Sequence, residues 1–166
     1  MILYPKLYLQ NVTKITYEIL KENNIKGVLL DVDNTLIDYD KKLLDGVESW
    51  IKQLKEKEIK FCILSNTNQK EKVDNVAKKL DIPYIFFAKK PLKTGFKKAQ
   101  KKLGLSHQEI AVVGDQIFTD VIGANRCKMF SILVKPINEK DIFITKIKRP
   151  IEESIIKKYL KTKEEK

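Results

Sequence analysis

Short apolar runs alternate with amphipathic stretches along most of the chain. Buried β-strands are predicted at Gly27–Asp31, Phe61–Ser65, Tyr84–Phe87, Ile110–Gly114 and Ser131–Val134. Runs that are apolar at nearly every position are typical of parallel strands covered on both faces. The stretches between them carry apolar residues at helical spacing, and such alternation predicts an α/β fold, a Rossmann-like doubly wound parallel sheet.

The predicted helices each have one apolar stripe. The stripes consist of Val47, Trp50, Ile51 and Leu54; of Val73, Val76, Ala77 and Leu80; and of Leu92, Phe96, Ala99 and Leu103. Gly104 is expected to end the third helix, and Ser106 to Glu109 resembles a capping box that opens a short turn. A further helix is expected after Gly114. His107 and Trp50 are expected at the surface and in the core, respectively.

The length of 166 residues predicts a single domain spanning residues 1–166. Within it, residues 136–166 form a C-terminal extension or an amphipathic helix that begins near Pro150. Its apolar face, which carries Ile151, Ile155 and Tyr159, has two possible fates. It packs on the core, or it lies in a membrane interface beside residues 142–144.

The cysteines, the absence of a long apolar stretch and the first residues of the sequence indicate the cellular compartment. Cys62 and Cys127 sit among apolar or small residues and are interpreted as reduced core thiols. No apolar stretch is long enough to cross a bilayer, and residues 1–6 lack a secretory signal pattern. The expected location is the cytoplasm, with peripheral contact at the inner face of the membrane as an option.

The chain carries a formal net charge of +11, from 33 basic and 22 acidic residues. Arg126 and Arg149 are its only arginines, so the excess is almost entirely lysine. Such a charge favours an anionic partner: a lipid surface, a nucleic acid or a phosphorylated substrate. A general lysine bias of the proteome explains the charge equally well.

Polar residues stand where the predicted strands end. Asp31 ends the first strand, Ser65 and Asn66 the second, and Asp115 the fourth, while Lys90 follows the third. The carboxyl ends of parallel strands share one edge of a sheet, which is where open α/β sheets bind ligands. These side chains are therefore expected to converge on one site.

Each residue type suggests a role in phosphoryl transfer. Asp31 could attack phosphorus and form an aspartyl-phosphate, while Asp33 could protonate the leaving oxygen and then activate water. Ser65, with the adjacent backbone N–H groups at Asn66, could hold phosphoryl oxygens, and Lys90 could neutralise their charge.

A magnesium site is expected at the same edge. Asp115 and Asp31 could hold Mg²⁺, which prefers a few carboxylates together with waters and substrate oxygens. Asp120 is expected beside them, orienting Lys90 or a metal-bound water.

Four segments resemble the motifs of the haloacid dehalogenase (HAD) superfamily, in the expected order. They are Asp31-Val-Asp33-Asn34-Thr35-Leu36, Ile63-Leu64-Ser65-Asn66, Lys89-Lys90-Pro91 and Gly114-Asp115-Gln116-Ile117-Phe118-Thr119-Asp120. The resemblance implies a HAD-like fold in which Asp31 is the nucleophile and Asp33 the acid and base. It also implies that both help to hold Mg²⁺, Asp33 through its backbone carbonyl, and that Thr35 lies near the ligands. Lys90 rather than Lys89 is expected to face the site.

The resemblance extends to the YqeG subgroup of type IIIA HAD phosphatases over nearly the whole chain. That subgroup is similar to mitochondrial phosphatidylglycerophosphate phosphatases, so the resemblance implies a lipid phosphate monoester as substrate. The intervals from Asp31 to Ser65 and from Ser65 to Lys90 are too short for an inserted cap domain. An open site suits a large substrate or one presented at a surface. Seven lysines and no acid between residues 89 and 102 suit docking to an anionic leaflet, or make an ordinary solvated helix face.

Other functions remain open. The same site could act on a soluble sugar phosphate, a nucleotide or a phosphoprotein. A phosphoacceptor signalling domain also collects acids, a hydroxyl and a lysine at strand ends, but in another order. A nucleic-acid- or ribosome-associated role is compatible with the charge, although no nucleic-acid-binding signature appears. The sequence indicates no oligomeric state.

Overall fold

The structure, a computed structural model, describes residues 1–138 and 143–165. Six parallel strands form one sheet in the order β1-β6-β5-β2-β3-β4. Their bounds are β1 Leu7–Leu9, β2 Gly27–Leu30, β3 Lys60–Leu64, β4 Tyr84–Ile85, β5 Ile110–Gly114 and β6 Phe130–Val134. The predicted α/β architecture is confirmed.

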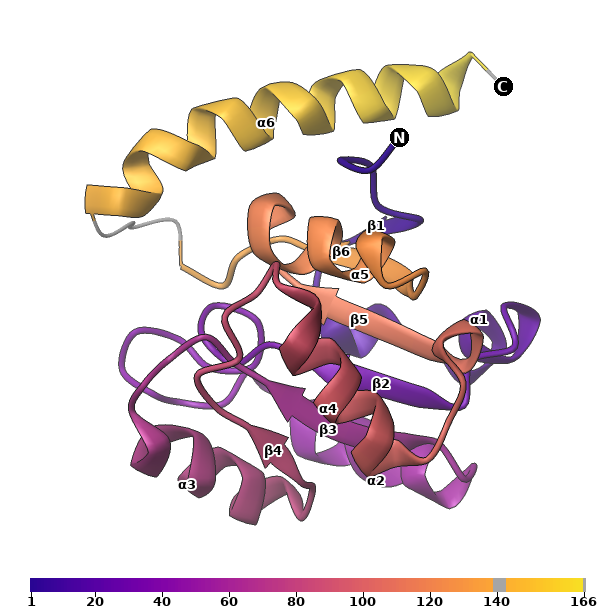
Figure 1. Ribbon diagram of the computed structural model, residues 1–166, viewed down its shortest axis with the longest axis vertical. Helices are drawn as coiled ribbons and strands as arrows, with labels where there is room; N and C mark the ends of the chain where they lie inside the picture. The colour runs from indigo at the N-terminus through magenta and orange to yellow at the C-terminus, as the bar shows by residue number, and fades with distance from the viewer. Residues whose placement is uncertain (139–142, 166) are drawn as a thin grey trace.

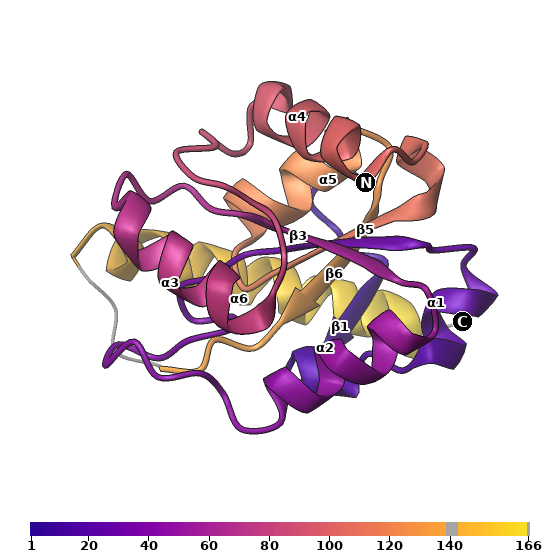
Figure 2. The same cartoon turned by 90° about the horizontal axis from the view of Figure 1, so that it is seen from below.

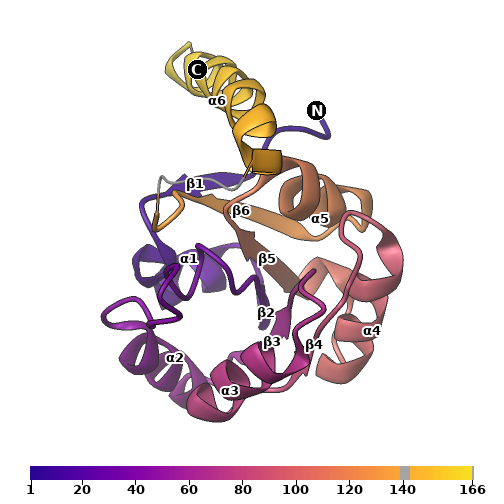
Figure 3. The same ribbon diagram turned by 90° about the vertical axis from the view of Figure 1, so that its left-hand side faces the viewer.

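Helices cover both faces of the sheet, as Figure 1 and the end-on view of Figure 3 show. The helices are α1 Tyr17–Glu22, α2 Val47–Glu56, α3 Lys70–Leu80, α4 Lys93–Leu103, α5 Ile122–Arg126 and α6 Phe143–Glu164. One face carries α1, α2 and α3, and the opposite face carries α4 and α5 (Figures 2 and 3). Helix α6 lies beyond the end of the sheet formed by β1 and β6. Short 3₁₀ turns occupy Val12–Lys14 and His107–Glu109, and a wide π-type turn occupies Ile117–Val121.

The two core layers follow from the alternation of side chains along the central strands. Val28 and Leu30 of β2 face the layer formed with α2 and α3, and Leu29 faces the layer of α4. All four residues of β2 and all five of β5 are buried, as the continuous apolar runs predict. The apolar stripes of α2 and α3 are buried in full, and Trp50 lies in the core.

Several local predictions are confirmed and others are wrong. Gly104 ends α4 in a left-handed conformation, and Glu109 accepts the backbone N–H of Ser106 in the expected capping box. Leu92 is not part of the α4 stripe, because it precedes the helix and is 51% exposed. The third predicted strand ends at Ile85 rather than Phe87, since Phe87 adopts a positive φ and turns outward. Strand β1 was not predicted.

The C-terminal helix begins earlier than predicted, and it packs on the core, which is one of the two predicted alternatives. It begins at Phe143, so Pro150 lies inside it rather than in its first turn. Ile155 and Ile156 pack against the core cluster of Ile117, Val121 and Leu133. Tyr159 is buried, with its ring 5.7 Å from that of Tyr4.

Two other apolar residues of this helix are not covered by the core. Ile151 and Leu160 stay exposed. Residues 139–142, including Ile142 of the proposed membrane face, lie outside the described part of the chain. No helix among the described residues is long and apolar enough to cross a membrane.

Candidate active site

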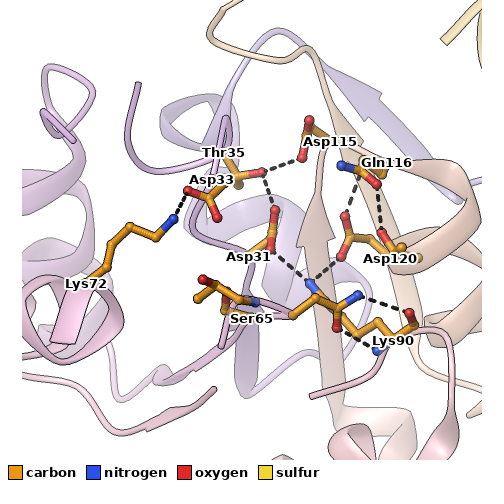
Figure 4. A network of polar contacts seen from close by, with 12 residues as sticks. Asp31, Asp33, Thr35, Ser65, Lys72, Lys90, Asp115, Gln116 and Asp120 are labelled. Carbon is orange, nitrogen blue, oxygen red and sulfur yellow. Dashed lines mark hydrogen bonds and ion pairs between the residues drawn. The ribbon is translucent and has the colours of Figure 1, made fainter. Parts of the chain in front are cut away.

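The predicted convergence occurs at the carboxyl edge of the sheet (Figure 4). Asp31 directly follows β2, Ser65 follows β3, Asp115 follows β5, and Lys90 lies in the loop between β4 and α4. Residues 31–59, between β2 and β3, contain two isolated bridges and helix α2. The absence of an inserted cap domain in this interval agrees with the prediction.

Lys90 is the central cation of the site. Its Nζ lies 2.9 Å from Asp31 Oδ1 and 2.6 Å from Asp120 Oδ1, and its side chain is 2% exposed. Burial alone would lower the pKa of Lys90, but the carboxylates of Asp120 and Asp31 outweigh it and raise that pKa above its usual value. Lys89 instead stacks on the ring of Phe87, 4.9 Å from its centroid. Lys90, and not Lys89, therefore pairs with Asp31 and Asp120, and its role in binding phosphate stays a prediction.

Asn66 holds the loop that carries Lys90. Its Oδ1 accepts the backbone N–H of Lys90 at 2.6 Å, and its Nδ2 donates to the carbonyl of Lys90 at 3.0 Å. These two hydrogen bonds fix the backbone of Lys90 and therefore the position of its Cα. The side-chain amide of Asn66 therefore positions Lys90, and phosphate binding predicted at this residue stays a prediction for its backbone N–H.

Three carboxylates gather beside Lys90. Asp31, Asp115 and Asp120 each offer one oxygen, and these oxygens lie within 4.8 Å of one another. Burial, followed by the charges of Asp31 and Asp120, raises the pKa of Asp115 well above its usual range. Burial also raises the pKa of Asp120 to about 6, against the opposing ammonium of Lys90. Carboxylates held this close repel one another when ionised, so the donor set fits a divalent cation.

Gly114 makes room for this arrangement. A Cβ at Gly114 would collide with the carboxylate of Asp120. The same carboxylate accepts the backbone N–H of Gln116 at 3.2 Å, so the loop after β5 folds back on its own side chain. A residue with a side chain at position 114 would push Asp120 away from Lys90.

Two hydroxyl groups complete the buried part of the site. Thr35 Oγ1 lies 3.4 Å from Asp31 Oδ2 and 3.3 Å from Asp115 Oδ1, the two carboxylates predicted to hold a metal. Ser65 is 1% exposed, and its Oγ accepts the backbone N–H of Thr67 at 3.3 Å. Since that contact uses the oxygen as acceptor, the hydroxyl proton of Ser65 can be donated to a ligand.

Asp33 lies on the other side of Asp31 from the buried acids (Figure 4). Its carboxylate is 2.8 Å from Lys72 Nζ, and its side chain is 52% exposed. The side chain of Asp33 is thus outside the carboxylate cluster, and Asp120 stands in it instead. Metal contact through the backbone carbonyl of Asp33 stays a prediction.

Comparison with known proteins places this geometry in a family. Residues 39–128 match the haloacid dehalogenase-like hydrolases. A probable phosphatase, YqeG of Bacillus subtilis, is 38% identical over 153 residues, which cover 92% of this chain and 88% of that protein. The chain belongs to the haloacid dehalogenase-like hydrolases. The prediction of a HAD-type phosphoric monoester hydrolase is confirmed.

Two further proteins resemble this hydrolase. The chloroplastic/mitochondrial phosphatidylglycerophosphate phosphatase 1 of Arabidopsis thaliana is 27% identical over 168 residues, covering 95% of this chain. The hydrolase spans about half the length of that relative, 48%. The crystal structure of an uncharacterized protein from Listeria monocytogenes superposes with a TM-score of 0.56 at 21% identity, over 71% of this chain and 85% of that chain, which shows the fold.

Part of the hydrolase site lies outside the matched residues and escaped sequence reasoning. Arg149 of α6 donates to Asp115 twice, with Nη2 2.6 Å from the carboxylate and Nη1 2.9 Å from the carbonyl. One turn later, Glu152 Oε1 accepts the backbone N–H groups of Ile117 and Phe118 at 3.1 and 3.3 Å. Glu152 is 3% exposed, and burial raises its pKa. Helix α6 thus braces the loop that carries Asp115 and Asp120.

The arginine count is the one sequence signal for this brace. Arg126 also touches an active-site loop, with Nη1 3.3 Å from the carbonyl of Pro91. The chain has two arginines, and both contact loops of the site. Lysine supplies its other basic side chains. The planar guanidinium can bridge two acceptors where an ammonium offers a single point charge, which suits Arg149 to its two contacts with Asp115.

Proposed function

We propose that the protein hydrolyses phosphate monoesters through a covalent aspartyl-phosphate on Asp31. The proposal rests mainly on one observation, the meeting of Asp31, Asp33, Ser65, Lys90 and Asp115 at a single edge of the sheet. Family membership supports the same class of reaction.

The reaction has two steps. In the first, a carboxylate oxygen of Asp31 attacks phosphorus, the bond from phosphorus to the ester oxygen breaks, and Asp33 gives that oxygen a proton. In the second, water attacks phosphorus, its proton passes to Asp33, and the bond from Asp31 to phosphorus breaks. Inorganic phosphate leaves and Asp31 is restored.

The charge on the phosphoryl oxygens is met by groups that the fold already holds in place. Lys90 supplies a buried ammonium 2.9 Å from Asp31, and Asp120 keeps it there at 2.6 Å. The hydroxyl of Ser65 and the backbone N–H of Asn66 are the proposed donors to these oxygens. Donors fixed before the reaction need no reorganisation as charge develops, and for this reason they stabilise the transition state strongly.

Mg²⁺ is the proposed cofactor. Asp31, Asp115 and the backbone carbonyl of Asp33 would hold it, with Asp120 and Thr35 beside them. When bound, the ion would offset the negative charge of the acids and of the phosphoryl group. Asp115 is oriented for this role by Arg149, which occupies its Oδ2 at 2.6 Å and leaves Oδ1 toward Thr35.

Phosphatidylglycerophosphate is the proposed substrate, and the enzyme would reach it at the inner face of the membrane. The support is the 27% identity to the Arabidopsis phosphatase over 95% of this chain. Five exposed lysines of α4 add a cationic face next to the Lys90 loop: Lys93, Lys97, Lys98, Lys101 and Lys102. Hydrolysis of a soluble sugar phosphate, nucleotide or phosphoprotein is the alternative use of the same site.

Phosphate release from phosphatidylglycerophosphate in mixed micelles tests the proposal. The assay compares Mg²⁺ with EDTA and the wild type with Asp31→Asn, alongside a panel of small soluble phosphomonoesters. Mg²⁺-dependent release from the lipid that Asp31→Asn abolishes would support the whole proposal. Release only from a soluble ester would keep the reaction and change the substrate, and no release from any ester would overturn the proposed function.

A further inference from the structure

A cationic cavity is lined by Lys72, the residue whose ammonium pairs with Asp33. It has a volume of about 540 Å³ and lies between the turn that follows the first motif and the start of α3. Its charged lining consists of three lysines and a single glutamate: Lys41, Lys70, Lys72 and Glu71. Ile37 and Val76 supply apolar walls.

Lys72 joins this cavity to the reacting groups. Its Nζ is 2.8 Å from the carboxylate of Asp33, and its side chain is only 15% exposed although it belongs to the first turn of α3. Asp33 is the residue assigned to protonate the leaving oxygen. The first atoms of the leaving group must therefore pass close to Lys72, and the cavity is where the rest of a short leaving group would lie.

The turn that carries Lys41 is held by backbone hydrogen bonds to Asp38. Asp38 Oδ1 accepts the backbone N–H groups of Asp40 and Lys42 at 2.9 and 3.0 Å, and the Asp38 carbonyl accepts that of Lys41 at 3.0 Å. Within the described part of the chain, Lys41 and Lys70 form no ion pair with an acidic side chain. The positive charge of the cavity is consequently available to a ligand.

We propose that this cavity binds a second anionic group of the substrate, carried by the leaving group a few bonds from the scissile phosphate, with Lys72 as its main contact. The class of ligand is a phosphodiester or a second phosphate on a short polyol linker. The inference rests on the proposed function, because it assigns the leaving group to the side of Asp33. It turns a general phosphatase site into one that selects a substrate with two separated negative charges.

Simple ion pairing between Lys72 and Asp33 is the competing explanation. A pair that only stabilises the fold, or only orients Asp33, would affect all phosphomonoesters alike. A leaving-group subsite would affect substrates according to their second charge. The two explanations therefore differ in substrate preference rather than in absolute activity.

The experiment compares two soluble substrates that need no membrane. The leaving group of glycerol 3-phosphate is uncharged. The deacylated headgroup glycerophosphoglycerophosphate carries an anionic phosphodiester in its leaving group. We expect the wild type to prefer the headgroup in kcat/KM by about tenfold or more, and Lys72→Met to reduce that preference about tenfold. Lys79→Met, on the exposed face of the same helix, should leave both values of kcat/KM unchanged.

The outcomes separate this inference from the proposed function. Equal loss on both substrates in Lys72→Met would mean that Lys72 acts only through Asp33, and would overturn the subsite. A wild type that hydrolyses both esters without preference would also overturn it while keeping the reaction. A preference seen with the full lipid in micelles but not with the soluble headgroup would assign selectivity to the membrane. No hydrolysis of any ester would refute the proposed function itself.

Discussion

At the level of single residues, Lys90 shows how the sequence sets the chemistry of the site. An ammonium that is buried loses hydration, and it stays charged only because Asp31 and Asp120 lie within 2.9 Å. The same contacts hold Asp120 beside Asp31, so one cation organises two acids. Asn66 then fixes the backbone from which this lysine extends.

Replacing Lys90 should therefore lower both kcat/KM and the free energy of unfolding. We expect Lys90→Ala to lower kcat/KM for p-nitrophenyl phosphate by about a hundredfold or more. It should also lower the free energy of unfolding by about 3 kcal/mol, because it leaves buried carboxylates without their partner. Lys89→Ala, which removes an exposed lysine from the same loop, should change kcat/KM by less than about twofold. Equal losses in the two variants would contradict the assignment of Lys90.

Among the structural elements, α6 has a role that its amphipathic pattern did not reveal. Its apolar side packs on Ile117, Val121 and Leu133, and two polar side chains from the same helix reach the loop after β5. Arg149 and Glu152 lie 34 or more positions away from their partners in the sequence. Local spacing carries no signal for such contacts.

The brace predicts a graded response at Glu152. Glu152→Gln keeps an oxygen that can accept the N–H groups of Ile117 and Phe118, and Glu152→Ala does not. We expect kcat to fall about tenfold in Glu152→Ala and clearly less in Glu152→Gln, with Arg149→Lys resembling the alanine variant because it loses the bridge.

Steady-state kinetics and circular dichroism would check this grading. Lys158→Met, an exposed position on the same helix, is the control and should behave as the wild type. Equal losses in the glutamine and alanine variants, or no loss in either, would contradict a positioning role for α6.

The capping turn before β5 gives a prediction for acid pH. Lys26, at 2.8 Å, and the backbone N–H of Ser106 lower the pKa of Glu109 to about 2 from an ordinary value of 4.5. Since the folded state holds the proton less tightly than the unfolded chain, the stabilisation is complete above about pH 4.5 and fades as the pH falls toward 2.

Urea unfolding of the wild type and Glu109→Gln would measure this effect. The wild type should be more stable than the variant at pH 6, and the difference should shrink between pH 4.5 and pH 3. A difference that stays constant over this range would contradict the assigned pKa.

For the whole molecule, the strands that are buried on both faces can be predicted from the sequence. Elements that depend on contacts between distant parts of the chain cannot. The central strands are recognisable because both faces of β2 and β5 are buried, and every position must then be apolar. Strand β1 has three half-buried residues at the edge of the sheet, too few to form a pattern. Phe87 continues an apolar run but adopts a positive φ, which its residue type does not predict.

The candidate site follows the same division. Residues at strand ends could be predicted, because the edge of a parallel sheet brings them together whatever the details of the loops. Lys72 and Arg149 could not, since each reaches the site from a helix whose orientation depends on tertiary packing. Lys72 pairs with Asp33, and Arg149 pairs with Asp115. The two residues that the sequence did not reveal therefore hold the carboxylates of two residues that it did.

The net charge of +11 also belongs to the molecule as a whole, and its distribution decides whether the enzyme docks on lipid. The α4 helix exposes its lysines on the side opposite its buried stripe and begins three residues after Lys90. Each lysine held near an anionic leaflet contributes up to about 1 kcal/mol. We therefore expect the protein to bind vesicles that contain phosphatidylglycerol, and to release them as salt is raised from 50 to about 300 mM.

Replacing Lys97, Lys98 and Lys101 by glutamine should weaken this binding at least about tenfold, because it removes three charges from one face. The matched control replaces Lys52, Lys57 and Lys79, which lowers the net charge by the same amount on the opposite side of the sheet. Vesicle cosedimentation measures both variants against the wild type. If the two triple variants lose binding equally, net charge rather than α4 governs attachment. If binding survives high salt, apolar residues such as Ile151 and Leu160 of α6 become the better explanation, because insertion of apolar side chains is insensitive to ionic screening.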